Sequence, residues 1–336
     1  MGRSWRGVVV LAIGMLAAGA MALSPALSAA PPLTKKKANK LYVNVGEKAS
    51  DSELLDGIDS TGFLGAGATA ADSSLLGGMS PGDFQPSYTR TIVVNPGTDA
   101  TANGQALRNA LASITTASIT NPFLVKLEPG VYDVGTTPLQ TTPFVDIEGS
   151  GRLTRIEGSG SSNPAEGVVM LGPSTELRFL GIANTGGAEQ SRGVYLDGIN
   201  GRLHNVAINV TQADDNAVGI TVPSGTGVTI THTSVNARAN SGGDATGIVV
   251  AGTTSVVDSD INASGDGSPN YGIRADAALV QIDRSFLRGT TDAVNIGGGS
   301  ALIALSRIDG GVTGPNATCA GVYTPNNVFT ASTCPA

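Results

Sequence analysis

The sequence predicts an all-β fold, a right-handed parallel β-helix with a short N-terminal capping helix. Three observations favour this solenoid. Glycine accounts for 46 of the 336 residues, and charged residues make up only 14%, against about 25% in an average soluble protein. Short apolar runs alternate with glycine and proline along most of the chain. From Gly167 onward these runs recur with a period near 25 residues, which is typical of a solenoid.

The N-terminus has the layout of a secretory signal peptide. Arg3 and Arg6 precede an apolar run of 17 residues, Gly7 to Leu23, and small residues follow. We expect residues 1–30 to be this leader, and the product to be secreted, extracellular or periplasmic. An uncleaved anchor is the alternative, although 17 residues is the short limit for a membrane span. No later segment is apolar enough to predict a membrane span.

The charge balance argues against nucleic acid as a partner. The formal net charge is −7, and an acidic surface repels a phosphate backbone. The lysines cluster early in the chain, and only Lys126 comes later: Lys35, Lys36, Lys37, Lys40 and Lys48.

The two cysteines, Cys319 and Cys334, lie 15 residues apart near the C-terminus. In a secreted protein an even pair predicts one disulfide. Closing a loop of that size stabilises a fold by about 3 kcal/mol in the chain-entropy model. No histidine lies near the pair, and two thiols alone do not make a zinc site.

Residues 31–90 are expected to form a linker or stalk before the solenoid of residues 91–336. Residues 49–85 contain one motif twice, with a period of 21 residues. Each copy is too short to bury its apolar side chains alone. The apolar positions of the first copy are Leu54, Leu55, Ile58 and Phe63, and they match Leu75, Leu76, Met79 and Phe84 of the second. The motif resembles the Leu-Asp-Gly repeats of phage tail-fibre stalks and bacterial surface proteins. That resemblance implies a homotrimer assembled through residues 49–85, and a flexible spacer is the alternative.

The solenoid is expected to begin with the strand Thr91–Val94. Gly104 to Ala117 carries Leu107, Leu111 and Ile114 at helical spacing, so we expect a capping helix there. Short β-strands are then predicted at 124–127, 131–134, 145–147 and 154–156.

Each repeat after residue 166 opens with a small residue and two apolar residues at alternate positions. The spacings between openings are 26, 26, 28, 25 and 21 residues. Alternate side chains of a strand face opposite sides, so these apolar pairs are expected to point inward. The openings and their pairs are Gly167 (Val168, Met170), Gly193 (Val194, Leu196), Gly219 (Ile220, Val222), Gly247 (Ile248, Val250), Gly272 (Ile273, Ala275) and Ala293 (Val294, Ile296).

The intervening residues Thr221, Arg274 and Asn295 are expected to face solvent. We attribute the glycine excess to tight corners and the low aromatic content of 4% to a narrow interior. A β-sandwich is the alternative, but it would show turn signals every 8–12 residues without a 25-residue frame.

The first part of this region resembles the pectin-lyase-like and pectin-methylesterase-like superfamily of right-handed β-helices. The resemblance rests on the helix at 105–111, on Leu-Glu-Pro-Gly-Val-Tyr at 127–132, and on Val-Asp-Ile-Glu-Gly-Ser-Gly at 145–151 followed by Thr-Arg-Ile at 154–156. It implies a β-helix over residues 91–335. These motifs mark the first turns of that fold and carry no chemistry.

The catalytic signatures of the superfamily are not found. The Gln-Asp-Thr, Asp-Phe-Ile-Phe-Gly and Arg-x-Trp segments of the esterases are absent from the sequence. Carboxylates are spread along the repeats, and Asp214 and Asp215 are the adjacent pair. Paired carboxylates suit acid–base cleavage of glycosides, so Asp214 and Asp215 are weak catalytic candidates. A solvated loop rich in aspartate and asparagine is the alternative for this pair.

His204 and His232 fall in the second strands of successive repeats, at different offsets, where their rings can stack on one face. Without a third ligand or a nucleophile they predict neither a metal site nor a catalytic triad. We expect no metal and no cofactor. Tyr195 and Tyr271 are the best-placed aromatic side chains for contact with a glycan.

Two functional hypotheses follow. The first is a secreted, non-catalytic β-helix protein, at the cell surface or in an appendage, that binds glycans or other surfaces. The second is a polysaccharide hydrolase or lyase of the same fold, which rests on analogy of fold alone. A purely structural spacer without a ligand is a third possibility. The partner expected under the first two is a polysaccharide or another cell-surface ligand.

Overall fold

The computed structural model describes residues 88–335 apart from short gaps at 160–164, 187–189, 213–215, 241, 268 and 277, together with the backbone of two short strands. Those strands, β1 (Leu54–Leu55) and β2 (Ile58–Asp59), pair antiparallel. The leader, the remainder of the repeats at 49–85, and Asp214 and Asp215 lie outside the described residues. The chain divides into two units, 1–81 and 82–336, and the following concerns the second.

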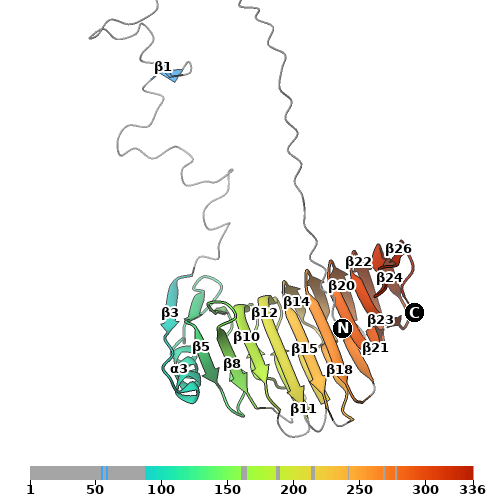
Figure 1. The fold of residues 1–336 in the computed structure, drawn as a ribbon. Coiled ribbons are helices and arrows are strands. Elements are labelled where there is room, and N and C mark those ends of the chain that lie inside the picture. The colour runs from blue at the N-terminus through green and yellow to red at the C-terminus, as the bar shows by residue number, and fades with distance from the viewer. Residues whose placement is uncertain are drawn as a thin grey trace, which may run out of the picture. The chain divides into compact units, whose positions relative to one another are not determined.

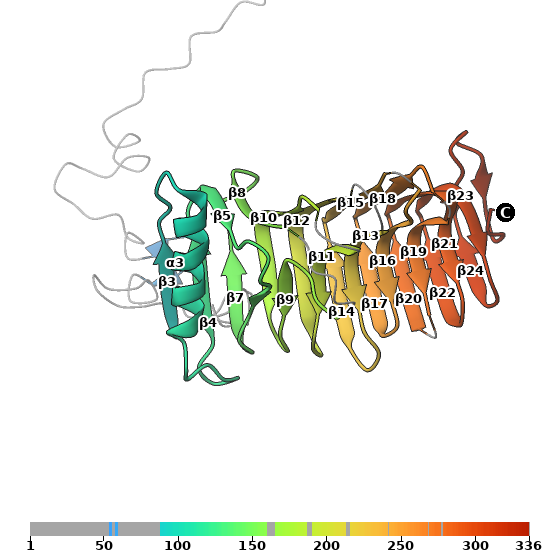
Figure 2. The ribbon, with the colours of Figure 1, turned by 90° about the horizontal axis from the view of Figure 1, so that it is seen from below.

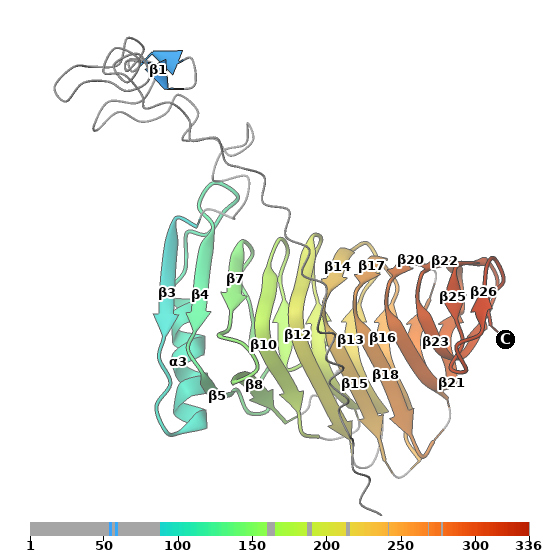
Figure 3. The same ribbon diagram turned by 45° about the horizontal axis from the view of Figure 1, so that its top comes forward.

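The second unit is a β-solenoid whose strands pair in parallel from turn to turn (Figure 1). Each turn visits three sheets, here called sheet 1, sheet 2 and sheet 3. Figures 2 and 3 show the turns following one another from β3 to the C-terminus. The predicted parallel β-helix is confirmed.

Sheet 1 begins with β3, and two of its later strands, β10 and β12, continue around a corner into sheet 2. Its strands are β3 (Arg90–Val94), β4 (Phe123–Leu127), β7 (Val145–Glu148), β10 (Glu176–Asn184), β12 (Gly201–Gln212), β14 (Gly227–Thr231), β17 (Thr253–Val257), β20 (Ala278–Asp283), β22 (Gly299–Ala304) and β24 (Ala317–Ala320).

Sheet 2 receives the ends of β10 and β12, and its strand β21 continues into sheet 3. Its other members are β5 (Gly130–Asp133), β8 (Thr154–Gly158), β15 (Ser234–Ala239), β18 (Asp260–Gly265), β21 (Phe286–Ile296), β23 (Arg307–Thr313) and β25 (Val322–Tyr323). Sheet 3 contains β6 (Leu139–Gln140), β9 (Val169–Leu171), β11 (Gln190–Leu196), β13 (Asn216–Val222), β16 (Ala245–Val250) and β19 (Asn270–Ala275). The last strand, β26 (Phe329–Thr330), pairs antiparallel with β25.

The capping helix α3 (Ala100–Ala112) is confirmed, with different ends from those predicted. It begins earlier because the Asp99 side chain accepts hydrogen bonds from the Thr101 and Ala102 N–H groups. It ends earlier, before the β-branched run Ile114 to Thr116, which favours extended structure. Leu107 and Leu111 are buried in the core. The helix lies at the β3 end of the solenoid (Figure 2).

The core is built from columns of inward side chains, each packed on the equivalent side chain of the next turn. One column runs the length of sheet 1, and every member is buried: Val125, Ile147, Leu177, Leu203, Ile230, Val256, Ile282, Ile303 and Cys319. Such stacking lets residues far apart in sequence share one apolar interior.

The predicted inward pairs are confirmed in five of the six repeats, and one prediction is wrong. In the repeat that opens at Gly167, Met170 faces outward, while Val169 and Leu171 are fully buried. The register explains the error: Val169 pairs with Val194, so Gly167 falls one residue before the position that Gly193 occupies. Val168 is buried as expected.

A second column consists of hydroxyl groups at the corner between sheets 1 and 2. Each hydroxyl donates a hydrogen bond to the carbonyl two residues before it in the chain. It also accepts a hydrogen bond from a backbone N–H group of the preceding turn. Thr233 N–H donates to Ser259 Oγ at 3.1 Å, Ser259 N–H to Ser285 Oγ at 3.1 Å, and Ser285 N–H to Ser306 Oγ at 3.0 Å. These buried corner N–H groups therefore all have partners, which a tightly bent backbone needs.

The residue before the corner position has a positive φ in successive turns, and none is glycine. The corner position itself is Leu180 and Val206 in two of these turns and a hydroxyl residue in the others. The φ values lie between 45° and 55°, a left-handed conformation that costs most residues energy: Phe179, Asn205, His232, Asp258, Arg284 and Leu305. The repeat glycines serve a different purpose from tight corners. A Cβ on Gly219 would lie 2.2 Å from Val235 Cγ1 and 2.5 Å from the Gly247 carbonyl oxygen.

The predicted disulfide joins Cys319 and Cys334, with 5.1 Å between the Cα atoms. Cys319 ends the inward column of sheet 1, so the bond ties the C-terminal tail to the core. Among the described residues, no helix is long and apolar enough to cross a membrane.

Replacing Gly219 with alanine is expected to lower the free energy of unfolding by about 1–3 kcal/mol, because the new methyl group overlaps the next turn. Gly227→Ala is the matched control, since a Cβ there meets no atom within 4 Å. Urea unfolding followed by circular dichroism measures both. Equal midpoints for the two variants would contradict the close approach described at Gly219.

Candidate functional site

The outer face of sheet 3 carries a groove of about 320 Å³. Strands β11, β13, β16 and β19 contribute to it, and they follow one another along the solenoid (Figure 2). Most of its lining is polar, and Val218 and Val249 add apolar contacts. The polar lining residues are Gln190, Arg192, Asn216, Thr221, Asp244, Thr246 and Arg274.

Two rows of outward side chains cross these strands. In the first row the parallel register places Arg192, Val218, Thr246, Tyr271 and Asp292 side by side. In the second it aligns Met170, Tyr195, Thr221, Val249, Arg274 and Asn295. Thr221, Arg274 and Asn295 thus face outward, as predicted.

An arginine and a tyrosine stand on the strand at each end of the groove. Arg192 and Tyr195 lie on β11, and Tyr271 and Arg274 lie on β19. These strands are three turns apart, or about 14 Å at the spacing of β-strands. Both tyrosines are half-buried. Whether they contact a glycan stays a prediction.

Arg192 is the most buried charge of the site, with 8% of its surface exposed. It donates a hydrogen bond to Gln190 Oε1. Burial lowers the pKa of the Arg192 guanidinium, Tyr195 acts in the opposite sense, and the positive charge of Arg274 adds to the lowering. Arginine nevertheless stays protonated. Arg192 and Arg274 thus give the groove two positive charges.

Arg274 is more exposed than Arg192 and pairs with Asp276 at 3.1 Å. A pair this exposed contributes little to stability, so Arg274 can exchange this partner for a ligand at small cost. Thr221 lies between the two arginines, and its buried Oγ1 has no hydrogen-bond partner among the described residues.

Near the groove, the carboxylate of Asp292 and the backbone of Asp244 are both held by hydrogen bonds. Asp292 accepts from Thr313 Oγ1 at 2.7 Å and from Asn295 Nδ2 at 3.4 Å. The Asp244 N–H donates to Asn216 Oδ1 at 2.9 Å. Asp214 and Asp215, the catalytic candidates, lie outside the described residues. Asn216, the next residue in the chain, lines the groove.

Two aspartates, one on sheet 2 and one at its corner with sheet 1, pair with exposed arginines. Asp258 pairs with Arg284 at 2.8 Å, and Asp309 pairs with Arg288 at 2.6 Å. Across the described ranges, no group of three or more histidine, cysteine, aspartate or glutamate side chains is close enough to hold a metal ion.

The two histidine rings lie together on one face as predicted, edge to face, with ring centroids 5.3 Å apart. They lie at the corner between sheets 1 and 2, and Phe179 contacts His204 at the same centroid distance. His204 Nδ1 is 2.9 Å from Thr231 Oγ1, and His232 lies 3.8 Å from Asp258. Each ring is thus engaged locally, at a corner away from the groove lining.

Gln190 and Arg192 were not among the residues predicted from the sequence. The repeat alignment contains the signal for Arg192, which directly precedes Gly193. Tyr271 and Asp292 directly precede the small residues of their own repeats, so alignment on these residues places all three in one row. The burial of the Arg192 side chain depends on how the neighbouring turns pack around it, and the alignment does not give that packing.

No protein-family model matches the chain, and no curated protein matches it. Solved structures do. A pectin methylesterase from Erwinia chrysanthemi is 11% identical with a TM-score of 0.40, covering 73% of this chain and 92% of its own. A pectin methylesterase from Aspergillus niger is 14% identical with a TM-score of 0.44, covering 71% and 84%.

An alginate lyase from Paenibacillus sp. is 13% identical with a TM-score of 0.36, covering 70% of this chain and 96% of its own. Identities and scores at this level give no argument about activity or about individual residues. The chain is a β-solenoid by its own strand pairing, and these proteins are what it is similar to.

The Tyr195 phenol provides a test of the geometry at the β11 end of the groove. Burial raises its pKa, and Asp197 adds to the effect. Above pH 10 the unfolded chain loses this proton while the folded chain still holds it, so stability falls as pH rises through the folded pKa. Tyr195→Phe is therefore expected to reduce the loss of unfolding free energy between about pH 9 and 11.

Urea unfolding at several alkaline pH values measures this slope. Tyr323→Phe is the control, because it removes one phenol from an exposed position on sheet 2 (43% exposed). Identical slopes for wild type and Tyr195→Phe would contradict the burial of this side chain.

Proposed function

We propose that this chain is a secreted, non-catalytic β-solenoid protein that binds an acidic polysaccharide along sheet 3. The observation that carries the proposal is a polar groove lined by two arginines, whose end strands β11 and β19, three turns apart, each also carry a tyrosine. Guanidinium groups hydrogen-bond carboxylates in two-point contacts. Tyrosine rings supply flat apolar surface next to a polar group.

An extended polymer suits this arrangement better than a compact ligand. The groove crosses several turns, and the strands that carry Arg192 and Arg274 are about 14 Å apart at the β-strand spacing. A polymer with a carboxylate on each sugar can meet both arginines at once. Gln190, Asn216 and Thr246 can then hydrogen-bond the hydroxyl groups between them.

The disulfide between Cys319 and Cys334 supports secretion, because such bonds persist mainly in oxidising compartments. The non-catalytic role is supported by the missing esterase segments in the sequence. It is also supported by the hydrogen bonds and ion pairs that engage Asp292, Asp258 and Asp309.

Affinity electrophoresis in gels containing polygalacturonate tests the proposal. The wild-type protein is expected to be retarded, and Arg192→Gln and Arg274→Gln are each expected to weaken binding about tenfold, the value of a hydrogen bond to a charged group. Raising the salt concentration should weaken wild-type binding. Arg288→Gln, which removes an arginine from sheet 2, is the matched control.

New reducing or unsaturated ends in the same samples would overturn the non-catalytic assignment. Asp214→Asn and Asp215→Asn would then be the first variants to assay for lost turnover. If the wild type, Arg192→Gln and Arg274→Gln are retarded equally, the proposal that sheet 3 is the binding face is wrong.

A further inference from the structure

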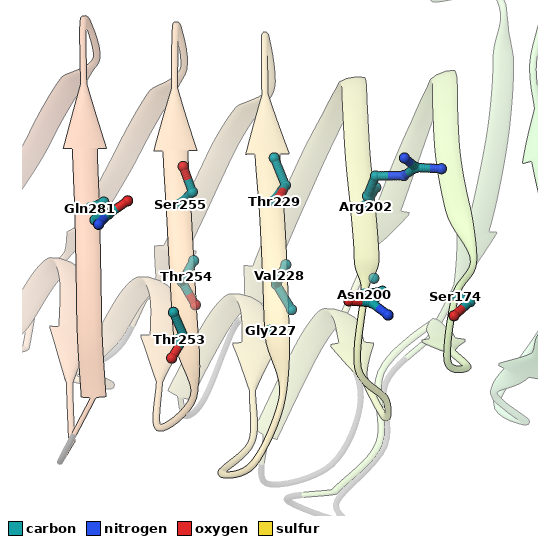
Figure 4. A pocket seen from close by; sticks show the side chains of 11 residues that line it. Ser174, Asn200, Arg202, Gly227, Val228, Thr229, Thr253, Thr254, Ser255 and Gln281 are labelled. Carbon is teal, nitrogen blue, oxygen red and sulfur yellow. The ribbon is translucent and has the colours of Figure 1, made fainter. Parts of the chain in front are cut away.

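Sheet 1 carries a larger groove, of about 560 Å³, on a face of the solenoid that the proposed function does not use. Figure 4 shows the side chains that line it, which come from consecutive turns. They are mainly hydroxyl and amide groups. We call it the hydroxyl groove, and its principal polar residues are Asn200, Arg202, Thr229, Thr253, Ser255 and Gln281.

One row of this groove is in strict register. Arg202 pairs with Thr229, Thr229 with Ser255, and Ser255 with Gln281. Figure 4 shows these four side chains on neighbouring strands. Each turn therefore presents one hydrogen-bonding group about 4.8 Å from the next. A polymer lying along the solenoid axis meets a polar group at every turn.

The charge of the hydroxyl groove differs from that of the sheet 3 groove. Arg202 is the one charged side chain among the described residues that line it. Its guanidinium lies 3.7 Å from Glu176, so a carboxylate already faces it. An acidic polymer would gain little here and would meet Glu176, whereas an uncharged polymer leaves this pair intact.

One hydroxyl on β17 belongs to the inner face of sheet 1 and takes no part in the row. Thr254 lies between Thr253 and Ser255. Its side chain is fully buried, and Oγ1 has no hydrogen-bond partner within the part of the chain that the structure describes. Buried hydroxyl groups normally have a partner. The Thr254 side chain faces inward, because its register partners Val228 and Val280 are core residues, so it contributes nothing to the outer face.

We propose that the hydroxyl groove binds an uncharged polysaccharide, laid along the solenoid axis over β12, β14, β17 and β20. Hydroxyl and amide groups both donate and accept hydrogen bonds, which matches the hydroxyl groups of neutral sugars. This site is separate from the sheet 3 groove and does not depend on it. With both sites occupied, one chain links a neutral polymer to an acidic one.

Affinity electrophoresis with hydroxyethylcellulose, a neutral glucan derivative, tests this site. The wild-type protein is expected to be retarded, and adding soluble polygalacturonate should not release it. The double variant Thr229→Val with Ser255→Ala removes two hydroxyl groups from the row and is expected to weaken binding about tenfold. Gln281→Leu, at the other end of the row, is expected to weaken it in the same direction.

Thr318→Val is the matched control, because Thr318 continues the same row beyond Leu302 and outside the groove. It should bind like the wild type. Arg192→Gln should also bind hydroxyethylcellulose normally, which separates this site from the one on sheet 3. Circular dichroism spectra establish that each variant is folded.

Three outcomes would overturn the inference: no retardation of the wild type, equal retardation of the wild type and both groove variants, or release by polygalacturonate. The last outcome would mean that one acidic-polymer site accounts for all binding. If the protein binds hydroxyethylcellulose but not polygalacturonate, only the function proposed for sheet 3 is contradicted, and the inference about the hydroxyl groove stands.

Discussion

The whole solenoid depends on one constraint, that each turn must place equivalent residues directly over those of the turn before. Parallel hydrogen bonds fix this register, and the buried column from Val125 to Cys319 fills the interior along it. The same register makes the corner hydroxyls of Thr233, Ser259 and Ser285 partners for neighbouring N–H groups. It also lines up the outward side chains, so that each groove is a product of stacking rather than of loops.

The two grooves can differ in polarity and charge because outward side chains do not have to pack in the apolar core. Sheet 3 presents a buried arginine and a second cation, while sheet 1 presents hydroxyls and an arginine already facing Glu176. Neither difference affects the inward columns. A β-solenoid can therefore carry separate recognition chemistry on separate faces while one repeating interior supplies the stability.

The repeat predicted the fold because inward apolar pairs such as Ile220 and Val222 recur with a steady period. The repeat predicted the wrong orientation for Met170, because the alignment there is shifted by one residue and a one-residue shift exchanges the inward and outward positions of a strand. The disulfide was predictable from two cysteines in a presumed secreted chain. The burial of Arg192 was not, because it depends on how the side chains of neighbouring turns pack around it. The sequence also did not reveal that Asn205 and His232 adopt a left-handed conformation at the corners. Nor did it reveal that Gly219 is needed because the backbone of the next turn lies too close for a side chain.

The final turns become progressively shorter. Ile282 and its partner Ile303 are 21 residues apart, and Ile303 and Cys319 only 16. The chain then reverses direction, because β26 runs antiparallel to β25. A stack of parallel strands with an open end is a template on which further strands can add without limit, as in amyloid. The reversal, held near the core by Cys319–Cys334, gives this end a short, mismatched edge and so guards the protein against end-to-end fibre growth.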